Sequence, residues 1–192
     1  MADPHRSFFA RWARFYERTP LFTRLLRSQQ DEAIRRLALL PQERVLDLGC
    51  GTGRALGMMR GAVGADSSLE MLRQAPRGRT ACALAGALPF GDGAFDALLC
   101  TNSFHHYPEP VLTLRELRRV LKPGGRAVIV DPNLHHPLGR LAIYGGEALI
   151  FGMATHLHAP LEWRSLCASA GFSQAAVQLL SGGVSVCIEA RA

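Results

Sequence analysis

The chain has 192 residues, a length that suits one domain with a complete hydrophobic core, and 48% of them are hydrophobic, which excludes a disordered protein. The formal net charge is +6, but the arginines are spread along the chain instead of forming a stripe with stacking aromatic residues, which argues against a nucleic-acid partner. The apolar runs are too short to cross a membrane and the N-terminus has no secretory pattern, so we expect a cytoplasmic protein.

Residues 1–27 combine aromatic and basic side chains at helical spacing. Five aromatic residues share one face of the expected helix: Phe8, Phe9, Trp12, Phe15 and Tyr16. A capping box of Ser28 and Asp31 is expected to start a further helix. The N-terminal segment could act as a lid over a site, pack on the core or contact an anionic membrane. We interpret residues 1–42 as a helical lid and residues 43–192 as the main domain.

A short apolar strand runs directly into three glycines at alternate positions, in the stretch Val45-Leu46-Asp47-Leu48-Gly49-Cys50-Gly51-Thr52-Gly53. Glycine accepts the positive φ and the close backbone approach that such a turn requires, and its N–H groups can face a ligand. A dinucleotide-binding fingerprint would need a third glycine at position 54, which is Arg54. The pattern therefore predicts a different nucleotide cradle, with Asp47 just before the turn.

A second acidic residue ends the next expected strand, residues 62–66. Asp66 follows Asp47 at a spacing of about 20 residues, which is where a cradle of this kind places a carboxylate against the two hydroxyls of a ribose. Ser67 is expected to cap the helix that follows. A strand-end aspartate can also be a plain helix cap, but the glycine turn favours the ribose interpretation.

The rest of the chain alternates strands with helices and turns. Strands are expected over residues 79–84, 95–103 and 126–130, a helix over 108–121, and a closing hairpin over 175–180 and 184–190. This alternation predicts an α/β, doubly wound sheet. Residues 133–159 form a long apolar connection, which we interpret as an insertion that covers the substrate.

Several motifs occur in a fixed order: VLDLGCGTG from Val45, ADSSLEML from Ala65, LPF from Leu88, HH at His105, LRELRRVLKPGG from Leu114 and AGF from Ala170. In this combination the chain resembles the small class I S-adenosylmethionine (SAM)-dependent methyltransferases of the ubiquinone/menaquinone-biosynthesis type, the methyltransferase type 11 family. The resemblance covers roughly residues 43–190. It is specific for the fold and the cofactor and silent on the acceptor.

The resemblance implies a seven-stranded Rossmann-like sheet in the order 3-2-1-4-5-7-6, mostly parallel with the last strand antiparallel. It implies SAM as the cofactor, bound by Asp47, Gly49, Gly51, Gly53, Asp66, Ser67, Ala85, Leu88 and Thr101. The implied activity is methyl transfer to a small-molecule or lipid-like acceptor. Members of the family commonly bind adenine through an acidic residue where this chain has Leu84, so we expect the backbone near Ala85 to replace that contact.

A general base is needed only if the acceptor arrives protonated, because the sulfonium methyl is already electrophilic. His105 and His106 are the catalytic candidates, since histidine titrates near neutrality; a structural role for both is the alternative. The candidate substrate contacts are Tyr16, Tyr107, His135, His136 and Tyr144. We predict no metal site, because the loop histidines lack cysteine or carboxylate partners at ligand spacing.

Two other functions stay open at this point. The basic, aromatic N-terminal segment would also suit a phospholipid N-methyltransferase with a peripheral membrane contact. The absence of an acidic residue at Leu84 would suit a catalytically silent SAM-binding protein.

The cysteines indicate a reducing compartment. They are Cys50, Cys82, Cys100, Cys167 and Cys187, and none forms a C-x-x-C pair. We therefore expect buried, reduced thiols and no disulfide.

Overall fold

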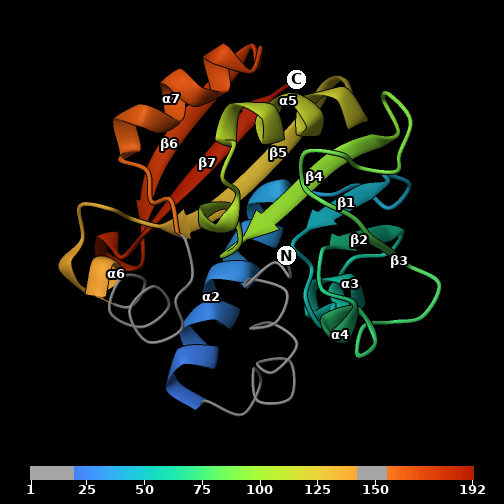
Figure 1. Cartoon of the computed structure of the whole chain (residues 1–192), viewed down its shortest axis with the longest axis horizontal. Helices are drawn as coiled ribbons and strands as arrows, with labels where there is room; N and C mark the ends of the chain where they lie inside the picture. The colour runs from blue at the N-terminus through green and yellow to red at the C-terminus, as the bar shows by residue number, and fades with distance from the viewer. Residues whose placement is uncertain (1–19, 142–154) are drawn as a thin grey trace, which may run out of the picture.

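The computed structural model describes residues 20–141 and 155–192. One seven-stranded sheet, in the order β3-β2-β1-β4-β5-β7-β6, forms its centre (Figure 1). The strands are β1 (Val45–Leu48), β2 (Ala62–Asp66), β3 (Thr80–Cys82), β4 (Phe95–Thr101), β5 (Leu121–Pro132), β6 (Gln174–Leu180) and β7 (Ser185–Arg191). The strand order implied by the resemblance is therefore confirmed.

The first five strands pair in parallel, and β7 is antiparallel to both β5 and β6. In the β1–β2 register, Asp47 lies beside Gly64, so Asp47 and Asp66 face the same side of the sheet. The carboxyl ends of the parallel strands meet at one edge, which is where ligands bind in open α/β sheets. The predicted mostly parallel sheet is confirmed, and it brings the two acidic strand ends together.

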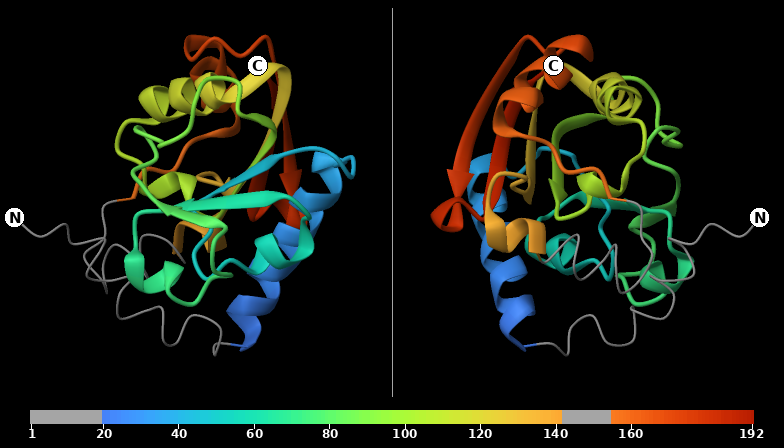
Figure 2. Two further views of the ribbon diagram at one scale, coloured as in Figure 1. Left: turned by 90° about the vertical axis from the view of Figure 1, so that its right-hand side faces the viewer. Right: turned by 60° about the vertical axis from the view of Figure 1, so that its left-hand side comes forward.

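Helices cover both faces of the sheet (Figures 1 and 2). The first face carries α2 (Pro20–Leu37), α3 (Arg54–Met58) and α4 (Leu69–Leu72); the second carries α5 (Pro110–Val120), α7 (Pro160–Ser169) and the short 3-10 helix η2 (Phe104–His106). The connections contain α6 (Pro137–Arg140) and the 3-10 turn η4 (Ser181–Gly183). This arrangement is the expected doubly wound architecture.

A hydrophobic core fills each of the two layers. Between the sheet and α5 and α7, Phe95, Phe104 and Trp163 are fully buried. Between the sheet and α2, Ala33 and Leu37 are fully buried against the opposite face of the strands. Burying one such large apolar side chain stabilises the fold by about 1.5–3 kcal/mol, so α2 is an integral layer of the domain.

The predicted helix start at Ser28 is wrong, because α2 continues without a break through this position. The Ser28 hydroxyl donates to the carbonyl of Leu25 at 2.8 Å, a bond within the helix that does not cap a new one. The predicted cap of α4 is displaced by one residue. Ser68, and not Ser67, accepts the N–H of Met71 at 3.3 Å.

The cysteines are all free, as expected. Cys50, Cys100, Cys167 and Cys187 are buried, but Cys82 is exposed. The prediction of burial is therefore wrong for Cys82, because β3 is a short edge strand of the sheet.

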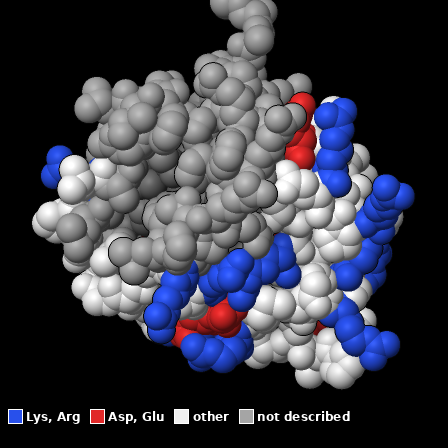
Figure 3. Space-filling model, turned by 90° about the horizontal axis from the view of Figure 1, so that it is seen from below, with Lys and Arg blue, Asp and Glu red and all other residues white. Residues whose placement is uncertain are grey.

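Residues 1–19, with Tyr16 and most of the predicted aromatic helix, and Tyr144 lie outside the described residues. In the part that the structure describes, no helix is both long and apolar enough to cross a membrane. Seen from below (Figure 3), the basic side chains are distributed along the margin of the face with acidic side chains among them. The described basic residues do not form one continuous patch on this face.

Candidate functional site

A cavity of about 570 Å³ opens at the carboxyl ends of the parallel strands. Its polar lining includes Gly49, Gly51, Asp66, Ser67, Thr101, Asn102, Ser103, His106, Tyr107, Glu109, Thr113 and His156. Its apolar lining includes Leu48, Ala65, Met71, Ala83, Leu84, Ala85, Ala87, Pro108 and Leu112. Among the described residues, neither lysine nor arginine lines this cavity. The site therefore suits a ligand with apolar surface and no strong negative charge.

The glycine turn requires its glycines for two different reasons. Gly49 has φ +68°, and a Cβ at this position would come within 2.5 Å of the Cβ of Ser103 and 2.9 Å of the Tyr107 hydroxyl. Gly51 has φ +54°, but a Cβ there would meet no atom within 4 Å. Gly49 therefore allows close packing inside the protein, whereas Gly51 keeps space open on the cavity side.

Asp66 is partly buried at the end of β2 and is held by backbone donors. It accepts the N–H of Gly51 at 2.9 Å and the N–H of Ser68 at 2.8 Å. Burial raises the pKa of Asp66, and the backbone hydrogen bonds oppose that effect. The carboxylate thus links the glycine turn to the start of α4 and also lines the cavity.

Asp47 lies beneath the glycine turn and is only 1% exposed. Its Oδ2 atom has no hydrogen-bond partner within the described part of the chain. Burial, together with the neighbouring Asp66, raises the pKa of Asp47 to about 8. An unpartnered buried carboxyl of this kind is costly in its charged form unless a cation is supplied.

A small hollow of about 50 Å³ separates α2 from the glycine turn. The Gln30 amide donates to the Thr101 hydroxyl at 3.3 Å, and Arg54 donates to Gln30 at 2.7 Å and to Asp31 at 2.8 Å. Polar side chains of α2 are therefore joined to both the end of β4 and the start of α3. This network holds α2 across the glycine turn.

The two adjacent histidines occupy different environments. His105 is 1% exposed, and its Nδ1–H donates to Asp131 Oδ1 at 2.9 Å. His106 lines the cavity, and its ring lies 4.0 Å from the ring of His105, measured between centroids. The backbone carbonyl of His105 accepts the N–H of His156 at 2.7 Å. Only His106 of the two candidates is therefore positioned to meet a molecule in the cavity.

The Tyr107 side chain belongs to the same wall. Its hydroxyl lies 2.6 Å from the Ser103 hydroxyl, and burial raises the pKa of Tyr107 well above its ordinary value. The phenol therefore stays protonated near neutral pH and acts here as a hydrogen-bonding group.

The β3–β4 connection, which forms the Ala83–Ala87 wall of the cavity, is fastened to α5. Glu116 Oε1 accepts the N–H of Leu88 at 2.7 Å, and Arg119 donates to Glu116 at 2.7 and 2.8 Å. Arg119 also donates to the carbonyl of Phe90 at 2.9 Å. The hydrogen bond with Arg119 lowers the pKa of Glu116, which keeps the pair ionised. This wall is thus fixed by an ion pair and not by a crossover helix.

Arg119→Met should lower the free energy of unfolding by about 1–2 kcal/mol, because it leaves two carbonyls and the Glu116 carboxylate without their donor. This expected loss of stability is at the lower end of the range for hydrogen bonds to charged groups, because the Arg119 side chain is 34% exposed and water screens its interactions. Urea unfolding measures it, with Arg118→Met as the matched control on the exposed side of α5. Equal stability of the two variants would contradict the assigned role.

The structure does not bring every predicted site residue to the cavity lining. Asp47 lies beneath it, Gly53 packs near Pro76, and Leu88 is buried in the core. His135 is exposed and His136 lies beside Gly183 of η4, so neither lines the cavity. The described residues contain no group of three or more His, Cys, Asp or Glu side chains that could hold a metal ion.

Several residues of the cavity lining were not among the predicted site residues, including Glu109, Leu112 and His156. Glu109 and Leu112 stand at the start of α5, directly after the histidine pair, and their position in the chain could have indicated them. His156 depends on a backbone hydrogen bond to His105 across 51 positions of the chain, and no local signal predicts that contact.

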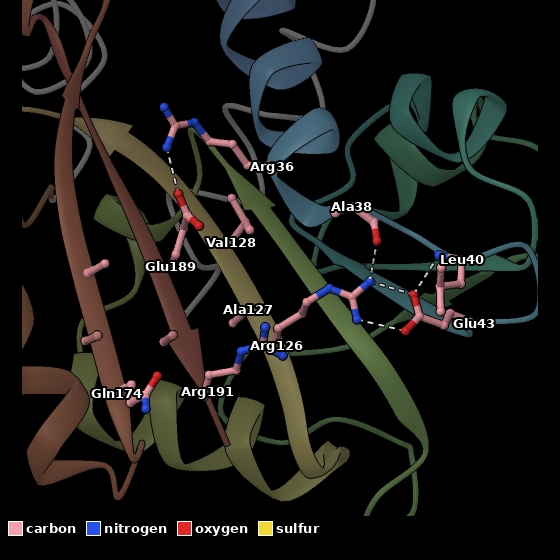
Figure 4. A pocket seen from close by; sticks show the side chains of 13 residues that line it. Arg36, Ala38, Leu40, Glu43, Arg126, Ala127, Val128, Gln174, Glu189 and Arg191 are labelled. Atoms are coloured by element: carbon pink, nitrogen blue, oxygen red, sulfur yellow. Dashed lines mark hydrogen bonds and ion pairs between the residues drawn. The ribbon is translucent and has the colours of Figure 1, made fainter.

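A second hollow, of about 560 Å³, lies away from the carboxyl ends of the strands, between α2 and the β5–β7–β6 part of the sheet (Figure 4). Arg126 points from β5 toward the end of α2, donates to the carbonyls of Leu37 and Ala38, and pairs with Glu43 at 2.5 Å. Arg36 pairs with Glu189 at 2.7 Å. The Arg126–Glu43 and Arg36–Glu189 pairs fasten the C-terminal end of α2 to the sheet.

Comparisons with known proteins agree with this geometry. The sequence model of a family described as "Methyltransferase domain" matches residues 46–129. An uncharacterized methyltransferase of Synechocystis is 34% identical over 81% of this chain and 79% of that protein. A demethylmenaquinone methyltransferase of Mycolicibacterium vanbaalenii is 36% identical over 67% of this chain and 61% of that protein. A 2-phytyl-1,4-naphtoquinone methyltransferase of Synechococcus elongatus is 36% identical over 57% and 53%.

Among solved structures, a SAM-dependent methyltransferase of Thermotoga maritima, described as a possible histamine N-methyltransferase, superposes with a TM-score of 0.81. The two are 26% identical, and the match covers 96% of this chain and 98% of the other. The chain spans a smaller part of several curated relatives, down to 35% of an uncharacterized protein from a Streptomyces fradiae transposon.

Proposed function

Because this chain belongs to the family of SAM-dependent methyltransferases, we propose that it transfers the methyl group of SAM to a small, apolar, uncharged acceptor that carries a ring hydroxyl. The observation that carries the proposal is the lining of the cavity: it is largely apolar, and among the described residues it contains no guanidinium or ammonium group for an anionic acceptor. An apolar lining with a few polar groups orients such a molecule.

The residues present fit the cofactor. SAM is a nucleoside with a vicinal diol, an ammonium and a sulfonium group, and it supplies an electrophilic methyl group when bound. Asp66 offers a carboxylate on the cavity lining, Gly51 leaves open space beside it, and Asp47 contributes a buried carboxyl without a partner. A largely apolar lining also favours the exclusion of water around the bound reactants, and orientation of the reactants alone can supply about 7–11 kcal/mol.

The names of the relatives support a ring acceptor. Two of them are described as a demethylmenaquinone methyltransferase and a 2-phytyl-1,4-naphtoquinone methyltransferase, names that refer to compounds with an apolar ring system. A third, from Penicillium expansum, is described as an O-methyltransferase and is 31% identical over 60% of this chain. An acceptor hydroxyl must lose its proton as the methyl group arrives, so this class of acceptor calls for a base.

His106 is the residue we assign to that role. It lines the cavity, whereas the phenol of Tyr107 stays protonated and the Asp66 carboxylate is occupied by backbone donors. His105, held by Asp131, acts as the positioning residue for the η2 turn that carries His106.

The identity of the acceptor is tested by measuring the transfer of a tritiated methyl group from SAM. Three candidate acceptors are offered: a reduced 1,4-naphthoquinone, histamine, and vesicles of phosphatidylethanolamine. We expect label in the naphthoquinol. Label only in the phospholipid would support the phospholipid N-methyltransferase alternative. Label only in histamine would show that the acceptor group is an amine and not a ring hydroxyl. SAM binding without transfer to any of the three would favour the silent SAM-binding alternative.

His106→Gln should lower kcat with the naphthoquinol about 100-fold, which is the low end for loss of a general base, and leave SAM affinity unchanged. His135→Gln is the matched control, since His135 is exposed and outside the cavity lining. The pH dependence of kcat separates the two roles of His106. A base gives a rate that rises with pH in the wild type and loses that rise in His106→Gln, whereas parallel pH profiles would contradict the assignment.

The lid role expected for residues 1–42 concerns the part that precedes α2, because α2 itself is packed on the sheet as a layer of the domain. Leu26, Arg27 and Gln30 face the glycine turn across the small hollow. We retain the lid as part of the proposal, with substrate contacts from Tyr16 and Tyr144. A peripheral membrane contact is its alternative, and flotation with anionic vesicles distinguishes the two.

A further inference from the structure

Among the described residues, the base of the proposed cofactor site contains two carboxyl groups, Asp47 and Asp66, and no cation bonded to either of them. We propose that Asp47 holds a proton in the empty protein and loses it when the cationic cofactor binds, so that SAM binding releases about one proton near neutral pH. The inference rests on the cofactor assigned above and adds the charge state of a residue beneath the site.

The geometry separates the two carboxyl groups clearly. Asp47 and Asp66 face the same side of the sheet from neighbouring strands. Asp66 accepts two backbone N–H groups, which favour its charged form. Asp47 is buried on the same side, and within the described part of the chain its Oδ2 atom has no hydrogen-bond partner that would favour the charged form. If the pair shares one proton, that proton therefore belongs on Asp47.

The other charged groups on this side do not reach Asp47. Arg54 of α3 is engaged by Asp31 and Gln30 of α2, and Arg27 of α2 lines the small hollow above the turn. The Cys50 thiol is neutral, because burial and the two aspartates raise its pKa. Asp131 points to the opposite face of the sheet, where it binds His105. Within the described residues, none of these groups forms an ion pair with Asp47.

The cofactor supplies the missing charge. SAM carries an ammonium, a sulfonium and a carboxylate, so its net charge is positive. A positive charge brought near a buried carboxyl favours the carboxylate strongly, because the protein interior screens charges far less than water does. Binding therefore exchanges a proton on Asp47 for the cofactor cation, and the proton leaves to the solvent.

Calorimetry tests the exchange directly. Titrations of SAM into the full chain at pH 7, in phosphate and in Tris buffer, give the number of protons released from the difference in buffer ionisation enthalpy. We expect about one proton for the wild type, and an affinity that rises about tenfold per pH unit between pH 6 and 7.5 and levels off above pH 8. Asp47→Asn should bind SAM with no proton release and with no such rise.

Asp131→Asn is the matched control, because it makes the same change at an equally buried strand-end carboxyl on the other face of the sheet. It should keep the wild-type proton count. Equal counts for the wild type and Asp47→Asn would overturn the inference, while the cofactor assignment would stand as long as SAM binds. No SAM binding by the wild type at any pH would instead refute the cofactor assignment.

Two measurements on the empty protein keep the test open, the first if Asp47→Asn folds but binds SAM poorly and the second if Asp47→Asn does not fold. The empty wild type should lose stability relative to Asp47→Asn as the pH rises from 6 to 8.5, because a folded-state pKa raised above the unfolded value destabilises the charged form. In wild-type protein with labelled aspartate, the Asp47 carboxyl resonance should titrate well above pH 6. A midpoint near the ordinary value of about 4 would overturn the inference.

Discussion

Gly49→Ala should destabilise the protein more than any other single methyl group added to the glycine turn. The new Cβ would overlap Ser103 and press on the Tyr107 hydroxyl, and φ at this position is +68°. The left-handed conformation costs about 1–2 kcal/mol for a residue with a Cβ, and overpacking adds about 1–3 kcal/mol. We expect a loss of about 2–5 kcal/mol in the free energy of unfolding, measured by urea denaturation.

Gly51→Ala is the matched comparison. Its Cβ meets nothing within 4 Å, so only the strain of φ +54° remains, about 1–2 kcal/mol. Because Gly51 lines the cavity, its added methyl group should weaken SAM binding more than it weakens folding. If both variants unfolded at the same urea concentration, the close approach of Gly49 to Ser103 would not be the reason for the glycine.

The sequence predicted the glycine turn and the sheet well, because both depend on local patterns. A strand, three glycines and two strand-end aspartates stand at fixed short spacings, and the order of strands follows from a recognisable series of motifs. Asp66 was predicted at a strand end beside the cavity, and the structure places it there with two backbone donors. The site role of Asp66 stays a prediction.

What sequence reasoning missed depends on contacts between distant segments. Ser28 carries a local capping signal, but burial of Ala33 and Leu37 favours one continuous helix. The fastening of the β3–β4 wall by Arg119 joins residues about thirty positions apart, and no spacing rule indicates it. His135 and His136 lie in the connection after β5, which suggested substrate contact, but its path takes them toward η4.

The unpaired state of Asp47 also could not be read from the sequence. The motif marks this residue as acidic, but its lack of a partner follows from how Gly51 and Ser68 direct their N–H groups to Asp66. Asp66 thereby has two backbone donors, whereas Asp47 Oδ2 has no partner within the described residues. The difference between the two aspartates is a property of the folded turn.

Asp66→Ala should weaken SAM binding by one to three powers of ten. The two ribose hydroxyls would lose a carboxylate acceptor, and hydrogen bonds to a charged group are each worth about 1.5–3 kcal/mol, with about 1.4 kcal/mol per tenfold in affinity. Asp66→Asn should be milder, because its amide oxygen still accepts one hydroxyl. Calorimetric titration of the three proteins with SAM measures the order.

The structure adds a folding cost to this prediction. Asp66 accepts the N–H groups of Gly51 and Ser68, so Asp66→Ala also frees two backbone donors, at about 1–2 kcal/mol of stability in a partly buried site. Ser68→Ala removes the cap of α4 and leaves the carboxylate in place, and it separates the two effects. It should lose a similar amount of stability and keep SAM affinity within a few-fold. If Asp66→Ala and Ser68→Ala weakened SAM binding equally, Asp66 would act only as part of the helix cap, and the ribose would have to be placed elsewhere.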